Sequence, residues 1–370
     1  MFDELNRLVQ EADPLGDAWT YTYDALGNRI SVTDANLMVN QYLYNAANQL
    51  VLVDYPAPDS DVAFSYDNGG RRLTMTDAVG VTTWTYDSLN RTTTVEDPSN
   101  AITGYGYDAV GNPTRLTYPD GSVVNYTYDN ESRLLTVDGL SSTINYTYDN
   151  ADRLRGIARS NGVNTTYAYD NANQLTGLAH MLDAQILGSH QYTYDPVGNR
   201  SQAIEQMNMQ DPPIQTTVTI DYIYDPLSRL KEANYSDNRY YHYTFDSVGN
   251  RLSQQSHLSS ETYTYDIANR LININATTYT WDNNGNLLTD GGSTYTYDHA
   301  NRMVEVSQAT VTASYVYNGR GDRVRETVNG ETTNFTLDLN SGPTQVLSDG
   351  TNTYLYGNER IAQMIGMESA

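Results

Sequence analysis

The chain has 370 residues, of which 45 are acidic and 21 basic, so its net charge is −24. This balance argues against nucleic acids and anionic membranes as partners, because both need basic surfaces. The absence of cysteine excludes disulfides and thiolate chemistry, and no apolar run approaches the roughly 18 residues of a membrane span. The 33 tyrosines, with threonine and valine in the periodic segments, favour strands over helices.

A short motif recurs along the whole chain. It is the tetrapeptide Tyr-Thr-Tyr-Asp or a close variant, spaced by about 21 residues. A fixed period of this size predicts an elongated repeat architecture, in which no unit buries its apolar face alone. The last motif position falls at Asp3, Asp24, Asn45, Asp67, Asp87, Asp108, Asp129, Asp149, Asp170, Asp195, Asp225, Asp246, Asp266, Asp282, Asp298 and Asn318.

The first complete unit, Tyr21–Ile30, predicts a strand followed by a turn. The Tyr-x-Tyr spacing places two rings on one face of the strand, and Asp24 begins the turn because its carboxylate can accept hydrogen bonds from backbone amides two residues on. In one variant a glycine stands three residues after the Asp and an arginine five after it, as at Gly27 and Arg29. In the other, arginine stands four after it, as at Arg91. This difference predicts one extra residue in the glycine form, taken up as a G1-type bulge.

A second turn is expected eight to eleven residues before the next motif Asp. Dipeptides typical of two-residue hairpin turns mark it. Two turns per period leave two strands of about six residues, so we predict an all-β fold of antiparallel hairpins in a continuous meandering ribbon, with ladders of stacked tyrosine and arginine. The dipeptides are Asp120-Gly121, Asp138-Gly139, Asn161-Gly162, Asp290-Gly291, Asn329-Gly330 and Asp349-Gly350.

These residues resemble the RHS/YD-repeat family, which includes bacterial polymorphic-toxin and toxin-complex proteins and the animal teneurins. The resemblance covers nearly the whole chain and rests on the Tyr-Asp-x-x-Gly-x-Arg pattern. It implies a β-strand spiral rolled into a hollow shell, which encloses a C-terminal toxic domain in the bacterial proteins and belongs to an adhesion ectodomain in teneurins. The resemblance also divides the chain into a YD-repeat shell, residues 1–353, and the start of a core-associated segment, residues 354–370.

Geometry limits what one row of hairpins could enclose. About 16 hairpins, or 32 strands at about 4.8 Å spacing, give a ribbon of about 150 Å, which would close into a ring about 50 Å across. Such a ring would encircle a small domain without sealing it. We therefore predict part of a shell. Because the chain begins inside a motif, at Asp3, we also expect a piece of a longer protein.

Two stretches depart from the period, and we expect irregular inserts there. Thr176–His190 has apolar residues near helical spacing, and Gln202–Ile214 loses the tyrosines and contains Pro212-Pro213, which cannot continue a ladder. Either insert could reflect neutral drift of the repeat. A functional insert would pack inside the shell or cover an open sheet edge.

The residues that resemble known sites align with the repeat. Arg320-Gly321-Asp322 would suggest integrin binding, and Asp282–Asn286 a calcium loop, yet both coincide with the turn of the unit. The histidines lack metal-ligand spacing, and we expect ordinary surface or core roles for His180, His190, His242, His257 and His299. We therefore predict no catalytic residue, no cofactor and no metal site.

Two functions remain open. The first is a structural shell segment that encapsulates or presents a partner polypeptide, such as a C-terminal toxin domain, without catalysis. The second is an extracellular adhesion or carbohydrate-binding module that uses a tyrosine-rich surface. The expected partners are an enclosed protein or remaining shell segments under the first function, and a carbohydrate or cell-surface receptor under the second. The resemblance implies a secreted or cell-surface location.

Overall fold

The computed structural model describes residues 1–183, 185–210 and 213–365, and every regular element in these ranges is a β-strand. No helix of the described part is long and apolar enough to cross a bilayer. The chain divides into two compact units. Unit 1 comprises Met1–Val123 and Tyr265–Ala370, and unit 2 comprises Val124–Thr264. The predicted all-β fold is confirmed.

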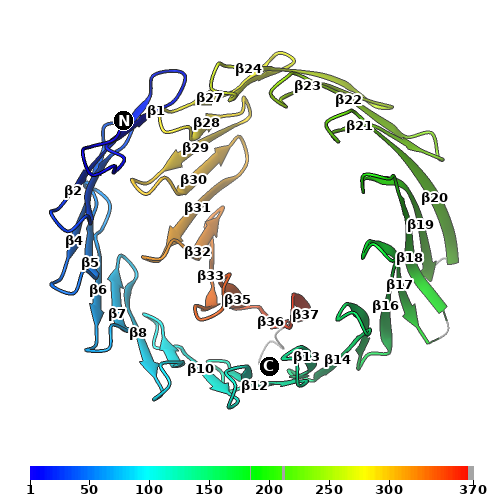
Figure 1. Cartoon of the computed structure of the whole chain (residues 1–370), viewed down its shortest axis with the longest axis horizontal. Coiled ribbons are helices and arrows are strands. Elements are labelled where there is room, and N and C mark those ends of the chain that lie inside the picture. The colour runs from blue at the N-terminus through cyan, green and yellow to red at the C-terminus, as the bar shows by residue number, and fades with distance from the viewer. Residues whose placement is uncertain (184, 211–212, 366–370) are drawn as a thin grey trace. The chain divides into compact units, whose positions relative to one another are not determined.

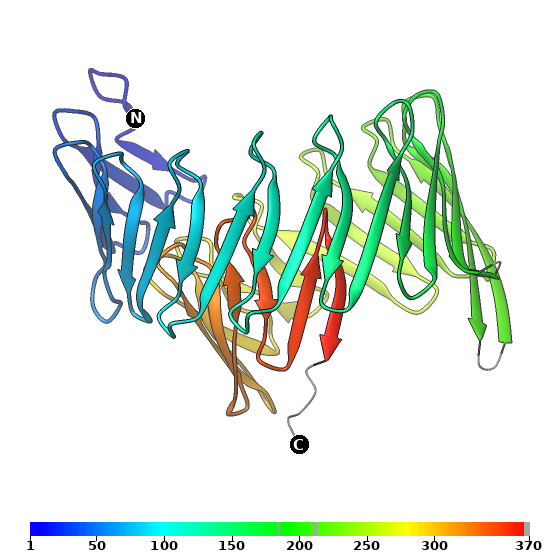
Figure 2. The ribbon, with the colours of Figure 1, turned by 90° about the horizontal axis from the view of Figure 1, so that it is seen from below.

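The first segment of unit 1 is an antiparallel meander in which each strand pairs with its predecessor in the chain. Its turns gather at two opposite edges of the ribbon (Figure 2). The strands are β1 (Gln10–Ala12), β2 (Ala18–Tyr23), β3 (Arg29–Thr33), β4 (Val39–Tyr44), β5 (Leu50–Asp54), β6 (Val62–Tyr66), β7 (Arg72–Asp77), β8 (Gly80–Tyr86), β9 (Thr92–Glu96), β10 (Ile102–Tyr107), β11 (Pro113–Thr117) and β12 (Val123–Tyr128).

The second segment of unit 1 holds β25 (Leu271–Ile274), β26 (Thr277–Thr278) and two smaller sheets, and it lies on one side of the first segment (Figure 1). The single ring estimated from the sequence is therefore wrong for these hairpins, because they pack on earlier hairpins instead of extending one row. The seven-stranded sheet contains β27 (Thr280–Trp281), β28 (Leu287–Thr289), β29 (Ser293–Tyr297), β30 (Met303–Gln308), β31 (Thr312–Tyr317), β32 (Arg323–Val328) and β33 (Glu331–Asn334). The four-stranded sheet contains β34 (Thr336–Asp338), β35 (Gln345–Ser348), β36 (Asn352–Tyr356) and β37 (Arg360–Ile365).

Unit 2 continues the same meander, and β1 to β26 belong to one 26-stranded sheet. Its strands are β13 (Leu134–Gly139), β14 (Ser142–Tyr148), β15 (Leu154–Arg159), β16 (Val163–Tyr169), β17 (Leu175–Leu182), β18 (Gln185–Tyr194), β19 (Arg200–Gln210), β20 (Pro213–Tyr224), β21 (Leu230–Tyr235), β22 (Tyr240–Phe245), β23 (Arg251–Ser256) and β24 (Ser260–Tyr265).

In the described residues the two predicted inserts form strands, with a register shift between His180 and Met181. Thr176–His190 forms most of the β17–β18 hairpin, so its apparent helical spacing was misleading, and Gln202–Ile214 lengthens β19 and β20. Pro213 pairs with Gln210 as the first residue of β20, a position where a proline is tolerated. Pro212 lies outside the described residues. The spacing between successive motifs is longer here because the strands are longer.

One of the predicted hairpin dipeptides is displaced. Asn329-Gly330 forms the two-residue loop between β32 and β33, and both residues have positive φ as a type I′ turn requires. Asp138-Gly139, in contrast, belongs to strand β13, and Gly139 pairs with Ser142. The turn there is Leu140-Ser141, with φ of 50° and 60°. The predicted boundary between residues 353 and 354 falls within β36 and stays a prediction.

The core is built from one repeat position, eight residues after the motif Asp. In the strands β5 to β11 of unit 1 this position holds large apolar side chains that are almost fully buried, and Met75 has no exposed surface. Val53, Met75 and Val95 form a cluster with Val62, Trp84 and Leu339 that includes residues of both segments of the unit. The same position in the two hairpins from β19 to β22 of unit 2 holds Ala203 and Ala233. The unit 1 residues are Val53, Met75, Val95 and Leu116.

Candidate functional site

The motif turn has one geometry in both sequence variants. In the glycine variant, Gly27 N donates to Asp24 O (3.2 Å) and Asp24 N donates to Asn28 O (2.9 Å). The bonds of Asn90 N to Asp87 O (3.1 Å) and Asp87 N to Arg91 O (2.9 Å) are equivalent. The residue three after the Asp has positive φ in each, 90° at Gly27 and 66° at Asn90. Both variants are three-residue loops with a G1 bulge, so the predicted extra residue is wrong.

The arginine four residues after the Asp joins neighbouring hairpins. Arg91 Nε donates to Asp87 Oδ2 (2.7 Å), while its Nη1 donates to the carbonyl of the next motif residue, Asp108 (2.7 Å). The guanidinium also lies over the Tyr107 ring, 4.8 Å from its centroid. Where asparagine replaces this arginine, as at Asn28, its amide donates to the same carboxylate oxygen, here Asp24 Oδ2 (2.9 Å). Arg7, Arg71, Arg153, Arg229, Arg270 and Arg302 repeat the double contact of Arg91.

The hydrogen bonds at this turn also lower the pKa of motif carboxyl groups such as those of Asp67 and Asp24. The side chain of Arg71 donates to Asp67, and with the Arg71 backbone amide it holds the pKa of Asp67 below its ordinary value of 3.8. The amide of Asn28 lowers the pKa of Asp24 in the same way. The motif Asp is thus a structural anion.

The arginine five residues after the Asp has a different role. Arg29, Arg72, Arg200, Arg251 and Arg323 begin the following strand and stack on rings of the Tyr-x-Tyr face. Arg29, for example, lies 5.6 Å from the ring centroids of both Tyr21 and Tyr42. The predicted tyrosine–arginine ladders are confirmed, and the two arginine positions belong to two separate contacts.

The motif tyrosine is anchored to the preceding hairpin through its hydroxyl. Tyr86 OH donates to Arg72 O (2.7 Å), and Tyr107 OH donates to Thr92 O (2.9 Å). The same bond recurs with Tyr23, Tyr66, Tyr148, Tyr169, Tyr224 and Tyr317. The opposite face carries hydroxyl pairs such as Thr22 with Ser31 (2.6 Å between their oxygens). The tyrosine face is therefore the packed face.

In unit 1 the second segment docks on the first along a line of contacts that we call the seam. On the first segment its members are the loop residues Asp34, Asn36 and Asp59 and the strand residues Asn40 and Asp77. On the second segment they are the motif turns at Asp282–Asn284, His299 and Gly319. The pair Tyr105–Asp338 completes the seam. Asn284 Nδ2 donates to Asp34 Oδ2 (2.6 Å), and Asn36 Nδ2 donates to Asp282 Oδ2 (2.9 Å). Gly319 N donates to Asp77 Oδ2 (2.6 Å). These partners lie 242 to 250 residues apart in the chain.

The deepest part of the seam buries a hydroxyl against a carboxylate. Tyr105 OH donates to Asp338 Oδ1 (2.7 Å), and Asp338 Oδ1 also accepts from the backbone N of Asn340 (2.9 Å). Burial, followed by the negative charge of Asp338, raises the pKa of Tyr105 well above 10. Nearby, Tyr118 OH donates to Tyr354 O (2.7 Å), and burial raises its pKa too.

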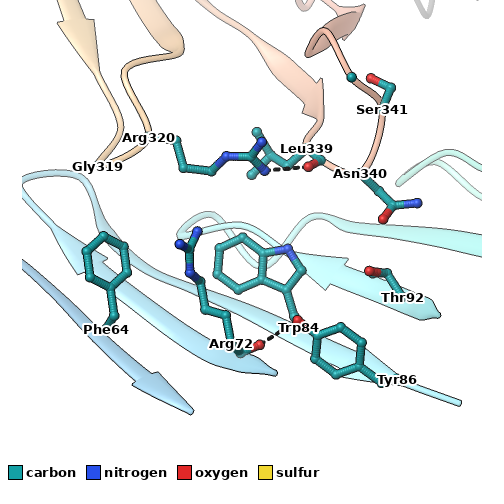
Figure 3. Close-up of a pocket in the computed structure, with 11 residues that line it drawn as sticks. Phe64, Arg72, Trp84, Tyr86, Thr92, Gly319, Arg320, Leu339, Asn340 and Ser341 are labelled. Atoms are coloured by element: carbon teal, nitrogen blue, oxygen red, sulfur yellow. Dashed lines mark hydrogen bonds between the residues drawn. The ribbon is translucent and has the colours of Figure 1, made fainter. Parts of the chain in front are cut away.

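A cavity of about 550 Å³ opens beside the seam (Figure 3). One wall comes from the tyrosine face of β6 to β9, including Arg72 between Phe64 and Trp84. The other wall is the turn Gly319-Arg320 and the loop 339–342. Arg320 Nη1 donates to Leu339 O, which connects the turn to the loop. The cavity combines two arginine side chains with an aromatic wall.

The sequence elements that resembled known sites take part in turns. Gly321 has φ of 90°, and Asp322 accepts a hydrogen bond from Asn318 Nδ2 (3.1 Å). Arg320-Gly321-Asp322 is therefore the motif turn of its repeat, as expected. In the loop 282–286, Asp282 accepts from Asn286 N and Nδ2 (both 2.8 Å). No group of three or more His, Asp or Glu able to hold a metal is found among the described residues.

Of the five histidines, His299 belongs to the seam, where it contacts two residues of the first segment. Its backbone N donates to Asp59 Oδ2 (2.6 Å), its ring Nδ1 lies 2.9 Å from the same oxygen, and its carbonyl accepts from Asn40 Nδ2 (2.9 Å). Sequence reasoning missed this role because the partners are about 240 residues away.

Comparison with known proteins identifies the repeat. A family model described as teneurin YD-shell matches residues 36–210 and 142–356, and an RHS repeat model matches residues 2–36. The chain belongs to the teneurin YD-shell family. The resemblance inferred from the motif is thereby confirmed.

Relatives and solved structures extend the comparison. The tRNA nuclease WapA of Bacillus subtilis (strain 168) is 27% identical over 146 residues, which is 36% of this chain and 6% of that protein. The Photorhabdus luminescens Tc holotoxin pore matches with a TM-score of 0.77 and 17% identity, over 98% of this chain and 21% of that one. The TcdB2–TccC3–Cdc42 structure gives 0.76 and 16%, over 98% and 22%. The fold is thus that of these RHS-repeat chains, of which this chain spans a minor part.

Proposed function

We propose that this chain is a segment of a β-shell that encloses or presents a partner polypeptide and performs no catalysis itself. The observation that carries the proposal is the tyrosine face, a continuous packed surface repeated from hairpin to hairpin. Turn arginines and tyrosine hydroxyls fix each hairpin to the next, which gives a stiff wall. The polar groups of the repeat serve its structure, since turn hydrogen bonds hold the pKa of aspartates such as Asp67 and Asp24 below the ordinary value.

The proposed partner is a polypeptide encoded with the shell, such as a toxin domain. The name of the relative WapA, a tRNA nuclease, and the Tc holotoxin pore are consistent with shells joined to toxins. The acidic composition would suit a secreted or cell-surface protein that must stay soluble despite many strand edges. We propose that location on family grounds.

Protection of a fused passenger tests the proposal. A small unstable domain fused after residue 370 should survive a broad-specificity protease longer than the free domain does. The same passenger fused to the Gly319→Val variant, in which the seam is disrupted, provides the control. Equal digestion of the fused and free passenger would contradict enclosure, and scattering data that indicate a solid particle would do so independently.

The alternative, a carbohydrate-binding surface, has one supporting observation. Tyr240, Tyr241 and Tyr243 in β22 of unit 2 are only partly buried, and partly exposed aromatic rings can stack on sugars. Several neighbouring rings already carry an arginine, however, with Arg200 3.8 Å from the Tyr192 centroid and Arg239 4.5 Å from that of Tyr235. Binding of this chain to a glycan array, abolished in a Tyr241→Ala variant, would favour the alternative.

A further inference from the structure

The cavity beside the seam differs in charge from the rest of the molecule. The whole chain carries 45 acidic residues, yet none of them lines this cavity. Its only charged side chains are two arginines, Arg72 and Arg320. Figure 3 shows Arg72 rising from the sheet toward Arg320, which lies across the opening. Two like charges directed into one space repel each other unless an anion lies between them.

Arg72 lacks the partners that the turn arginines have. Its guanidinium carbon lies 4.6 Å from the Phe64 ring centroid and 5.7 Å from that of Trp84. Its Nε is buried and has no hydrogen-bond acceptor among the described residues. Within that part of the chain it also forms no ion pair, whereas the adjacent Arg71 pairs with Asp67 at 2.6 Å. A guanidinium without a carboxylate partner binds an anion favourably, because its hydrogen bonds to the anion are charge-assisted.

Arg320 is anchored but not neutralised. Its Nη1 donates to Leu339 O, which fixes the side chain over the cavity. The nearest carboxylate oxygen, Asp322 Oδ2, is 3.9 Å from Nε and is also an acceptor for Asn318. The remaining guanidinium donors face the same space as those of Arg72 (Figure 3). The walls add Trp84, Tyr86 and the hydroxyl-bearing Thr92 and Ser341.

We propose that this cavity is a carboxylate-binding site, in which Arg72 and Arg320 hold the anion and the aromatic wall contacts its organic body. Planar guanidinium groups match the two oxygens of a carboxylate, and the bonds are charge-assisted. A volume of about 550 Å³ accommodates more than an inorganic ion. The carboxylate belongs either to a polypeptide, as a chain terminus or acidic side chain, or to a small organic acid.

Calorimetry with matched probes tests the site. Phenylacetate represents a small acid and acetyl-Gly-Phe a peptide terminus, while phenylacetamide and acetyl-Gly-Phe-amide are their neutral counterparts. We expect at least one acid to bind the intact chain and its amide not to. Arg72→Gln and Arg320→Gln should each weaken that binding about tenfold or more, since each removes charge-assisted hydrogen bonds. Binding of the peptide acid alone assigns a polypeptide source, and binding of phenylacetate shows that a free acid suffices.

Arg29→Gln is the matched control, because Arg29 has the same repeat position as Arg72 and also stacks on two rings, but does not line the cavity. It should leave binding unchanged. If circular dichroism shows that Arg72→Gln does not fold, binding is measured with Arg320→Gln and Arg72→Lys instead. The proposal is overturned if neither acid binds, if acid and amide bind alike, if sulfate competes as well as the acid, or if both cavity variants bind normally.

Discussion

The covered hairpins of unit 1 and the hairpins β19–β23 of unit 2 share every turn contact but bury their repeats differently. Eight residues after the motif Asp, unit 1 places Met75 and Val95 against a second segment. Unit 2 places Ala203 and Ala233 among the rings of Tyr192, Tyr222 and Tyr235 of the same sheet. A small residue lets neighbouring aromatic rings close over it, whereas a large one needs a covering layer. Side-chain volume at this repeat position therefore differs between the covered hairpins of unit 1 and the hairpins β19–β22 of unit 2.

The largest expected effect is at Met75. Met75→Ala should destabilise the chain by about 2–5 kcal/mol, because it removes a fully buried side chain at a site covered on both sides. The equivalent change in unit 2, Gln254→Ala, removes mainly a hydrogen bond from Arg251 (3.0 Å) and should cost about 1 kcal/mol. Urea unfolding of both variants measures the difference. Equal losses would contradict the distinction between the two walls.

The second prediction tests how tightly the second segment of unit 1 packs on the first. A Cβ at residue 319 would lie 2.4 Å from Val62 Cγ1, so Gly319→Ala should destabilise unit 1 by about 1–3 kcal/mol through overpacking at the seam. Gly292→Ala meets nothing closer than 3.7 Å and should change stability by less than about 0.5 kcal/mol. Thermal melting of the two variants compares them. A silent Gly319→Ala would mean that the seam is loose.

A third change tests what both units share. Gly249 has φ of 105° at the bulge position of its turn. Gly249→Val should lose about 1–3 kcal/mol from backbone strain. Gly249→Asn should lose much less, since Asn48, Asn90 and Asn173 already take positive φ at the equivalent position. Equal melting temperatures for Gly249→Val and Gly249→Asn would contradict a left-handed requirement.

The fourth prediction separates the two turn variants. Asp87 accepts from Arg91, which can only donate, so Asp87→Asn turns an amide NH₂ or a weaker acceptor toward a guanidinium. Asp246 accepts from the Asn250 amide, which can rotate to offer its oxygen instead. The melting temperature should therefore fall more for Asp87→Asn than for Asp246→Asn. The natural pair Asn45–Gln49 already uses the reversed bond, with Asn45 Nδ2 donating to Gln49 Oε1 (2.8 Å).

The last prediction concerns the pH dependence that Tyr105 contributes. Its pKa is raised by burial, so the folded state keeps the proton after the unfolded chain loses it near pH 10. The Tyr105 contribution to stability is thus complete below pH 10 and is lost as pH rises above it. Tyr105→Phe should flatten the alkaline decline in the free energy of unfolding, measured by urea titration at several pH values. An unchanged decline would mean that Tyr105 ionises freely.

Short-range features of the fold follow from the sequence, and long-range ones do not. The strands, the Asp-initiated turn and the tyrosine–arginine stacking depend on residues within about 20 positions, and the motif spacing encodes them. The extra residue was predicted because Arg29 and Arg91 were treated as one repeat position, whereas they stand at two positions with different contacts. Longer strands at Gln202–Ile214 were mistaken for an insert because proline was weighed without its place at a strand start. The seam joins positions 233 to 259 apart in the chain, and no local sequence pattern indicates these contacts.

A ribbon of near-identical units could dock one repeat too early or too late, and Gly319 prevents such slippage. Among the residues that directly follow the motif Asp or Asn, it is the only glycine. The neighbouring turns present His299 or Asn283 there, and any side chain with a Cβ would meet Val62 and Met75. The one turn without a side chain at this position therefore sets the phase of the docking. Insertion or deletion of a whole hairpin between the two segments would keep every turn intact yet bring the wrong residue to this point.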